Sequence, residues 1–335
     1  MQSVWKDPLR GKRYNLLALG YAVVGYVLGW AGLLSGSLWL AVPATLLLGH
    51  SMVIAAYMIH ECAHNTVFSD NKRNARLGKA LSWLVGGCYG SYEGIRHKHF
   101  RHHVDRADVV AFDYRGFLRQ HPVILKLVQA LEWCWIPATD LLMHIFVMLA
   151  PFRIDSYRKD KVLVLRAAII RLALIAAVAW FHWPALIGYA IAYCLFVIVM
   201  RTMDMHQHTF DVSFSLEQAH DKGKYDRAFE DRNTFSNLIS RRHPWLNLLV
   251  LNFGYHNAHH VRPTAPWYEL PAIHAGLVGT ERDNGIDFAT IMRSYHRFRV
   301  TRVLHEDYPD TDIGSGAERG RDFIGVYGVS FLTAL

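Results

Sequence analysis

The stretch YNLLALGYAVVGYVLGWAGLLSGSLWLAVPATLLLGHSMVIAAYMI, residues 14–59, decides the fold, because its 46 residues contain no Asp, Glu, Lys or Arg. A membrane-spanning helix needs about 20 predominantly apolar residues. The stretch is therefore long enough for two spans, and the small residues at 35–37 offer a turn between them. We expect the two spans over about residues 14–34 and 38–59.

A second apolar block follows later in the chain and has no charged side chain over residues 172–200. The pair Trp183-Pro184 can divide it, since proline interrupts a helix. We expect two further spans over about residues 164–182 and 184–205. With four spans, both ends of the chain lie on the same side of the membrane.

The distribution of basic residues predicts which side that is. Lys and Arg are absent from the two short connections on the opposite side, whereas the residues before the first span include Lys6, Arg10, Lys12 and Arg13. The positive-inside rule therefore places both termini and residues 60–161 in the cytoplasm. The net charge of +8 is then explained by faces beside anionic lipid. Since no recognition module accompanies the charge, a nucleic-acid partner is not expected.

These observations predict an all-α integral membrane protein. Its four transmembrane helices would carry a cytoplasmic helical cap made of residues 60–161 and 206–310. We expect one domain over residues 1–310 and a C-terminal tail, 311–335, whose role the sequence does not indicate. Within the cap, residues 77–92 and 123–151 are predicted as interfacial or interior helices, with a fifth span over the second as the alternative.

Histidine is the strongest chemical signal, with 20 residues in the chain. Residues four apart share one face of a helix, and so do residues three apart. An HxxxH pair follows the second span, an HxxHH group comes next, and a second HxxHH group lies near the end of the cap. The three groups are His60 and His64; His99, His102 and His103; and His256, His259 and His260. A fourth candidate group, His206 and His208, follows the fourth span.

Each group alone has an ordinary explanation in packing or solvent exposure. Together, at one membrane depth, the groups predict a metal site. Eight or nine imidazoles exceed the three or four that one zinc ion needs, so two metal ions are expected. Imidazole suits iron, copper, zinc and nickel, and the residues do not choose among them. The four cysteines show no CxxC spacing, so a thiolate site is not indicated.

The order HxxxH, HxxHH, HxxHH, divided by pairs of spans, resembles the membrane fatty acid desaturase family over about residues 14–275. The likeness extends to HECAHN (60–65), RHKHFRHHVDRAD (96–108) and GYHNAHHVRP (254–263). It implies two iron ions, O2 as co-substrate, and a double bond introduced into a fatty acyl chain. It also implies His208, rather than His206, as the additional ligand. The implied metal ligands are His60, His64, His99, His102, His103, His208, His256, His259 and His260.

Two alternatives stay open beside desaturation. A hydroxylase or ketolase, for example a carotenoid-modifying enzyme, shares this scaffold and returns oxygen to the substrate. A non-catalytic membrane protein that binds or transports metal would need polar residues along its spans, and these spans offer only His50 and Arg171. The acyl carrier, whether lipid, coenzyme A or acyl carrier protein, is not indicated, and neither is the bond position.

The expected partners are the lipid bilayer and a separate electron donor. The chain shows no dinucleotide fingerprint and no iron–sulfur motif, so a ferredoxin, rubredoxin or cytochrome would supply two electrons. Short loops without fused domains suggest a bacterial inner-membrane enzyme. Five residues near the histidine groups either orient ring nitrogens or are simply solvated. They are Glu61, Asp105, Asp108, Asp204 and Asn257. Four basic residues either contact an acidic electron donor or an anionic head group, or are ordinary interfacial charges. They are Arg96, Lys98, Arg101 and Arg262.

Overall fold

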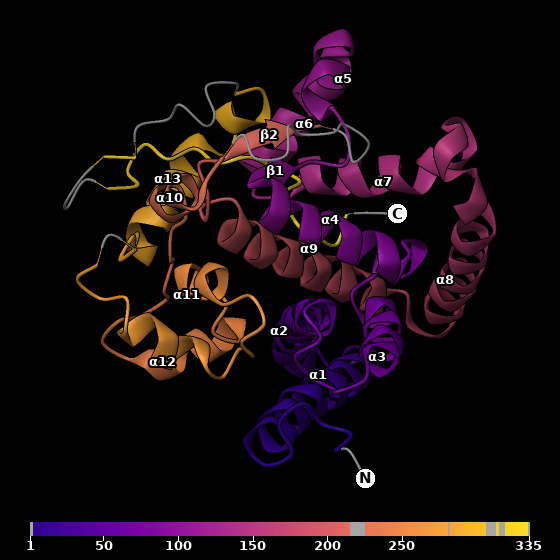
Figure 1. Ribbon diagram of the computed structural model, residues 1–335. Helices are drawn as coiled ribbons and strands as arrows, with labels where there is room; N and C mark the ends of the chain where they lie inside the picture. Colours follow the sequence, from indigo (N-terminus) through magenta and orange to yellow (C-terminus); the bar gives the residue numbers. More distant parts are fainter. Residues whose placement is uncertain (1–2, 215–224, 281, 306–312, 315–318, 334–335) are drawn as a thin grey trace. The chain divides into compact units, whose positions relative to one another are not determined.

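The computed structural model describes residues 3–214, 225–280, 282–305, 313–314 and 319–333, and it is mostly helical (Figure 1). The chain divides into two compact units. Among the described residues, the first comprises residues 3–95 and 148–199, and the second comprises residues 96–147 and the described part of 200–333.

The first unit is built around a pair of long apolar helices, α1 (Arg10–Leu34) and α2 (Leu38–Ala63). Gly36, with a φ of 74°, turns the chain between them in a conformation that favours glycine. The two helices pack along each other (Figure 1). Gly29 permits a close approach, because a Cβ there would lie 2.8 Å from the Cβ of Leu48. Small residues serve this purpose at helix contacts inside membranes.

Two further long helices, α8 (Lys161–His182) and α9 (Pro184–Asp204), follow the short 3-10 helix η2 (Asp155–Asp160). Within the described residues, α1, α2, α8 and α9 are the four helices long and apolar enough to cross a membrane. Their outer faces are apolar and exposed, and Trp39 and Trp180 are 91 % and 94 % exposed. The predicted helical architecture with four membrane helices is therefore confirmed.

Shorter helices complete the first unit. Helix α3 (Asn71–Leu84) is capped by the preceding residue, Asp70, whose carboxylate accepts a hydrogen bond from the backbone N–H of Lys72. It ends before Gly86, which has a φ of 79° and leads into the 3-10 helix η1 (Gly87–Tyr89). The expectation of one helix over residues 77–92 was therefore wrong, because the left-handed glycine interrupts it.

The second unit begins within α4 (Tyr92–Asp105), and α5 (Tyr114–Gln120), α6 (Pro122–Trp133) and α7 (Ala138–Arg153) follow. The alternative prediction of a fifth membrane span over residues 123–151 was wrong. The chain breaks near Pro137 into helices of 12 and 16 residues, each shorter than a span.

The rest of the second unit consists of short elements. They are β2 (Asp211–Ser213), α10 (Arg227–Arg232), η3 (Pro244–Val250), α11 (His256–Val261), α12 (Leu270–Ala275), α13 (Phe288–Phe298) and η4 (Thr301–Val303). Strand β2 pairs in parallel with β1 (Ala107–Val109), so that Ala107 faces Asp211. The all-α prediction omitted this pair, because three residues are too few to show alternation.

A charged network is buried in the second unit. The guanidinium of Arg201 donates to Glu132 Oε2 at 2.8 Å and to Asp140 Oδ2 at 2.9 Å. Its Nε also donates to the hydroxyl of Tyr295 at 2.7 Å. Glu132 is 0 % exposed. Through Arg201, the network connects the end of α9 to α6, α7 and α13, which are far from it in the sequence.

Candidate metal centre

The HxxxH pair lies at the C-terminal end of α2, in the first unit, with His60 in the last turn and His64 directly after it. His60 and His64 are both buried, and their ring centroids are 4.7 Å apart. The residues are four apart, so one helical face presents both rings. Glu61 Oε1 lies 3.7 Å from His60 Nδ1, and the other carboxylate oxygen accepts the hydroxyl of Thr66 at 2.6 Å.

The second unit gathers four histidines in a first cluster, which we call the four-histidine cluster: His102, His208, His256 and His260. One ring nitrogen of each lies within 4.8 Å of the others. His208 Nε2 and His256 Nε2 face each other at 2.7 Å. Two nitrogens bound to one ion at about 2.1 Å lie about 3 Å apart when their bonds are at right angles. The cluster therefore has the dimensions of a metal site.

Three other histidines of the same unit form the three-histidine cluster. His103 Nε2 lies 3.1 Å from His99 Nε2 and 3.1 Å from His259 Nε2. Helix α4 supplies His99 and His103, which lie four residues apart, and α11 supplies His259. The two HxxHH groups, distant in sequence, thus contribute to both clusters.

Burial keeps three of these imidazoles neutral. It holds the pKa of His208, His256 and His260 well below the ordinary histidine value, and the neighbouring imidazoles lower each pKa further. A metal ion needs the lone pair of a neutral imidazole. Because these rings are buried, they gain no hydration when no metal is bound to them. A set of neutral imidazole nitrogens therefore fits a metal ion.

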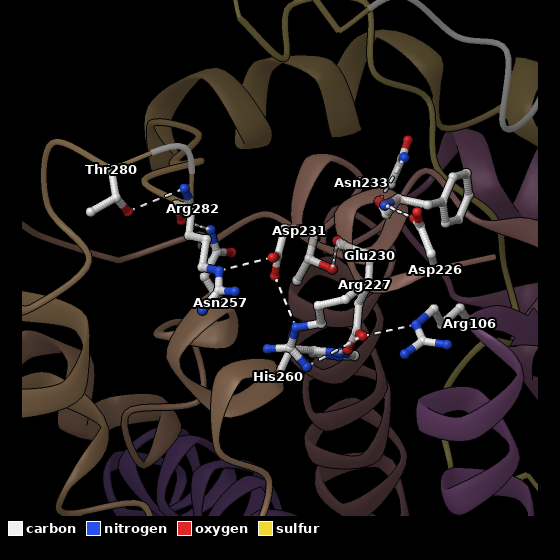
Figure 2. A network of polar contacts seen from close by, with 12 residues as sticks. Arg106, Asp226, Arg227, Glu230, Asp231, Asn233, Asn257, His260, Thr280 and Arg282 are labelled. Carbon is white, nitrogen blue, oxygen red and sulfur yellow. Dashed lines mark hydrogen bonds and ion pairs between the residues drawn. The ribbon is translucent and has the colours of Figure 1, made fainter.

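Glu230 of α10 orients one of these rings (Figure 2). Its Oε1 accepts a hydrogen bond from His260 Nδ1 at 2.9 Å, and its Oε2 accepts one from Arg106 Nε at 2.9 Å. His260 Nε2 is buried and has no hydrogen-bond partner among the described residues. A carboxylate on one ring nitrogen fixes the tautomer and leaves the other nitrogen's lone pair for a metal. Sequence reasoning missed Glu230, because it lies 30 residues before His260 outside any motif.

The acidic and amide residues named from the sequence do different things. Asp108 Oδ1 lies 3.4 Å from His102 Nδ1, beside a ring of the four-histidine cluster. Asp105 pairs with Arg101 at 2.8 Å. Asn257 donates to the carbonyl oxygens of two residues, Arg282 at 2.6 Å and Asn284 at 3.2 Å, and so holds a loop rather than a ring.

His206 lies outside both clusters. Its Nδ1 is 3.1 Å from the carbonyl oxygen of Thr202, and its ring meets Phe323 edge-on. Burial, and then the charge of Arg302, lower its pKa to about 3. His206 is thus a neutral core histidine in this unit.

A small cavity of about 40 Å³ adjoins the histidines in the second unit. Its walls mix ligand candidates with polar and apolar side chains. They are Lys98, His99, His102, Val109, Asp204, Gln207, His208, Phe253, His256, Val329 and Phe331. Lys98 is only 2 % exposed. The suggestion that it meets an electron donor at the surface was therefore wrong.

Two comparisons with known proteins bear on this site. Residues 37–290 match the family model described as fatty acid desaturase. The chain is also 27 % identical over 271 residues to sphingolipid delta(4)-desaturase DES1 of Xenopus tropicalis, an alignment that covers 77 % of this chain and 71 % of that protein. The nine histidines of the HxxxH pair and the two clusters lie within the region that the family model matches.

Proposed function

Since this chain belongs to the fatty acid desaturase family of O2-dependent membrane oxidoreductases, we propose that it introduces a double bond into the acyl chain of a lipid. The observation that carries the proposal is the pair of histidine clusters in the second unit, in which His208, His256 and His260 are buried and neutral. An acyl methylene offers no polar handle, so the protein must hold it beside the metal and exclude water.

We assign two iron ions to the histidines. The four-histidine cluster and the three-histidine cluster would each contribute to one ion. His60 and His64 join the proposed ligand set on the ground of the family resemblance alone. When bound, iron would supply the activation of O2 and the removal of two hydrogens, with two electrons from a separate ferredoxin, rubredoxin or cytochrome. Nitrogen-rich sites of this kind suit iron, and the family makes iron the first choice.

The chain's own residues prepare this chemistry. Burial keeps His208, His256 and His260 unprotonated. Carboxylates lie beside the Nδ1 atoms of two rings, Glu230 at His260 and Asp108 at His102. Phe253 and Val109 give the adjoining cavity apolar walls. Each acyl CH2 group buried against such walls contributes about 0.8 kcal/mol to binding.

The relative from Xenopus tropicalis is a sphingolipid desaturase by name, which favours desaturation over hydroxylation. It also makes a membrane lipid, rather than a soluble acyl thioester, the first substrate class to test. The charge distribution supports termini and site on the cytoplasmic side, and we propose a bacterial inner membrane as the location.

The test is lipid profiling by mass spectrometry. The protein is expressed with a ferredoxin and its reductase, beside His259→Ala as the control, and bound iron is measured on the purified protein. We expect a lipid that lacks two hydrogens in the wild-type strain alone. Oxygenated products alone would replace the proposal with a hydroxylase. An unchanged lipid profile despite bound iron and a working donor would refute it.

A further inference from the structure

The segment of residues 319–333 lies beyond the part of the chain that the family model matches, and the sequence suggests no role for it. In the structure most of it is buried in the second unit. Phe323, Val326, Tyr327 and Phe331 are all buried. We call residues 323–333 the C-terminal strap.

Two contacts hold the first half of the strap. The hydroxyl of Ser294 on α13 donates to the carbonyl oxygen of Phe323 at 2.6 Å. The hydroxyl of Tyr327 donates to the carbonyl oxygen of Arg299 at 2.6 Å. Gly328 turns the chain with a φ of 75°, and a Cβ there would lie 3.3 Å from the side chain of Met143. The path of the strap is therefore closely constrained.

Lys98 of α4 holds the second half. Its ammonium donates to the carbonyl oxygens of Ser330 at 2.8 Å and Gly328 at 3.2 Å, and to the hydroxyl of Thr333 at 3.0 Å. A buried ammonium needs such acceptors, because its desolvation is costly. Lys98 directly precedes His99 of the three-histidine cluster. One turn of α4 thus fixes both a proposed ligand and the strap.

This anchoring places two strap side chains at the cavity beside the histidines. Val329 and Phe331 line it together with His99, His102, His208 and His256. The ring of Phe331 meets the ring of His99 edge-on, with centroids 5.8 Å apart. The largest apolar side chain that the strap gives to the cavity therefore lies next to a proposed ligand.

We propose that Phe331 is a specificity-determining residue, which sets the carbon of the acyl chain that reaches the metal, and that Lys98 is the positioning residue that holds it there. The inference rests on the proposed function. An apolar wall selects by volume, and one methylene more or less in such a pocket changes selectivity roughly 10- to 200-fold. Shortening the side chain at position 331 would let the acyl chain shift along the cavity.

The experiment compares double-bond position and acyl-chain length in the lipids made by wild type, Phe331→Ala, Phe331→Leu and Lys98→Met. Bound iron is measured on each purified protein. We expect iron to be retained and the ratio of products to change roughly tenfold in Phe331→Ala, with a smaller shift in Phe331→Leu. Lys98→Met should move the ratio in the same direction. Ser294→Ala, which loosens the strap at Phe323, outside the cavity lining, serves as the matched control and should keep the wild-type ratio.

The outcomes separate the two proposals. Wild-type desaturation with an unchanged product ratio in both Phe331 variants would overturn this inference and leave the proposed function intact. An equal shift in Ser294→Ala would also overturn it, since the effect would then be general loosening. If wild type makes no desaturated lipid, the proposed function fails first. Should Phe331→Ala fail to fold, Phe331→Leu carries the test alone.

Discussion

The two units of this protein are stabilised by different forces. The first exposes large apolar side chains along α1, α2 and α8, which lipid can solvate, and α1 and α2 pack through small residues. The second buries charges: Arg201 with Glu132 and Asp140, and Glu230 with Arg106 and His260. The comparison teaches that apolar composition and close helix packing stabilise the first unit, whereas specific polar pairs between distant segments stabilise the second.

The largest effect is expected at the histidines. His260→Ala removes a buried ligand candidate from the four-histidine cluster, so the purified protein should lose bound iron and lipid desaturation should fall below detection. Iron content and product are measured on the same membranes. His243→Ala is the control, because His243 is exposed and lies outside both clusters. Normal iron and activity in His260→Ala would remove that residue from the proposed ligand set.

The next largest effect, on stability, is expected in the charged network of the second unit. Removing one partner of a buried ion pair costs about 3–5 kcal/mol, so Glu132→Ala should lower the unfolding temperature of the detergent-purified protein strongly. The matched control is Glu93→Ala. Its pair with Lys79 at 2.7 Å is exposed on both sides and is worth less than about 1 kcal/mol. Equal shifts in the two variants would break the contrast between buried and exposed charge.

What the sequence could predict follows the same division. The four membrane helices follow from uncharged runs, and the histidine groups follow from spacing within single helices; the family expected from them is confirmed. Contacts between distant segments leave no local pattern in the sequence, so they could not be predicted from it. Glu230 is 30 residues from the ring that it orients, and Lys98 is more than 200 residues from the strap that it holds. The β1–β2 pair was missed because each strand has three residues.

Glu230 offers a smaller and sharper test of the second unit. Glu230→Gln keeps the shape but removes the negative charge beside His260 Nδ1, and the amide would then also face the uncompensated Arg106. Loss of such a partner typically lowers metal affinity or activity by 10- to 100-fold, and we expect a decrease in this range in both. Iron binding is titrated alongside the desaturation rate. Glu269→Gln, whose partner Arg262 is exposed, should behave as wild type. A wild-type iron affinity in Glu230→Gln would show that the carboxylate does not support the ligand.

The smallest effect is expected where the first unit depends on packing alone. Gly29→Leu puts a side chain against Leu48 at the contact of α1 with α2, whereas Gly20 on the same helix has open space around it. Overpacking costs about 1–3 kcal/mol, so Gly29→Leu should lower the unfolding temperature in detergent, and Gly20→Leu should leave it unchanged. Iron content should stay normal in both, because neither position touches a histidine. If Gly20→Leu destabilises as much as Gly29→Leu, the loss does not come from the close contact of α1 with α2, and the role given to small residues in this unit is wrong.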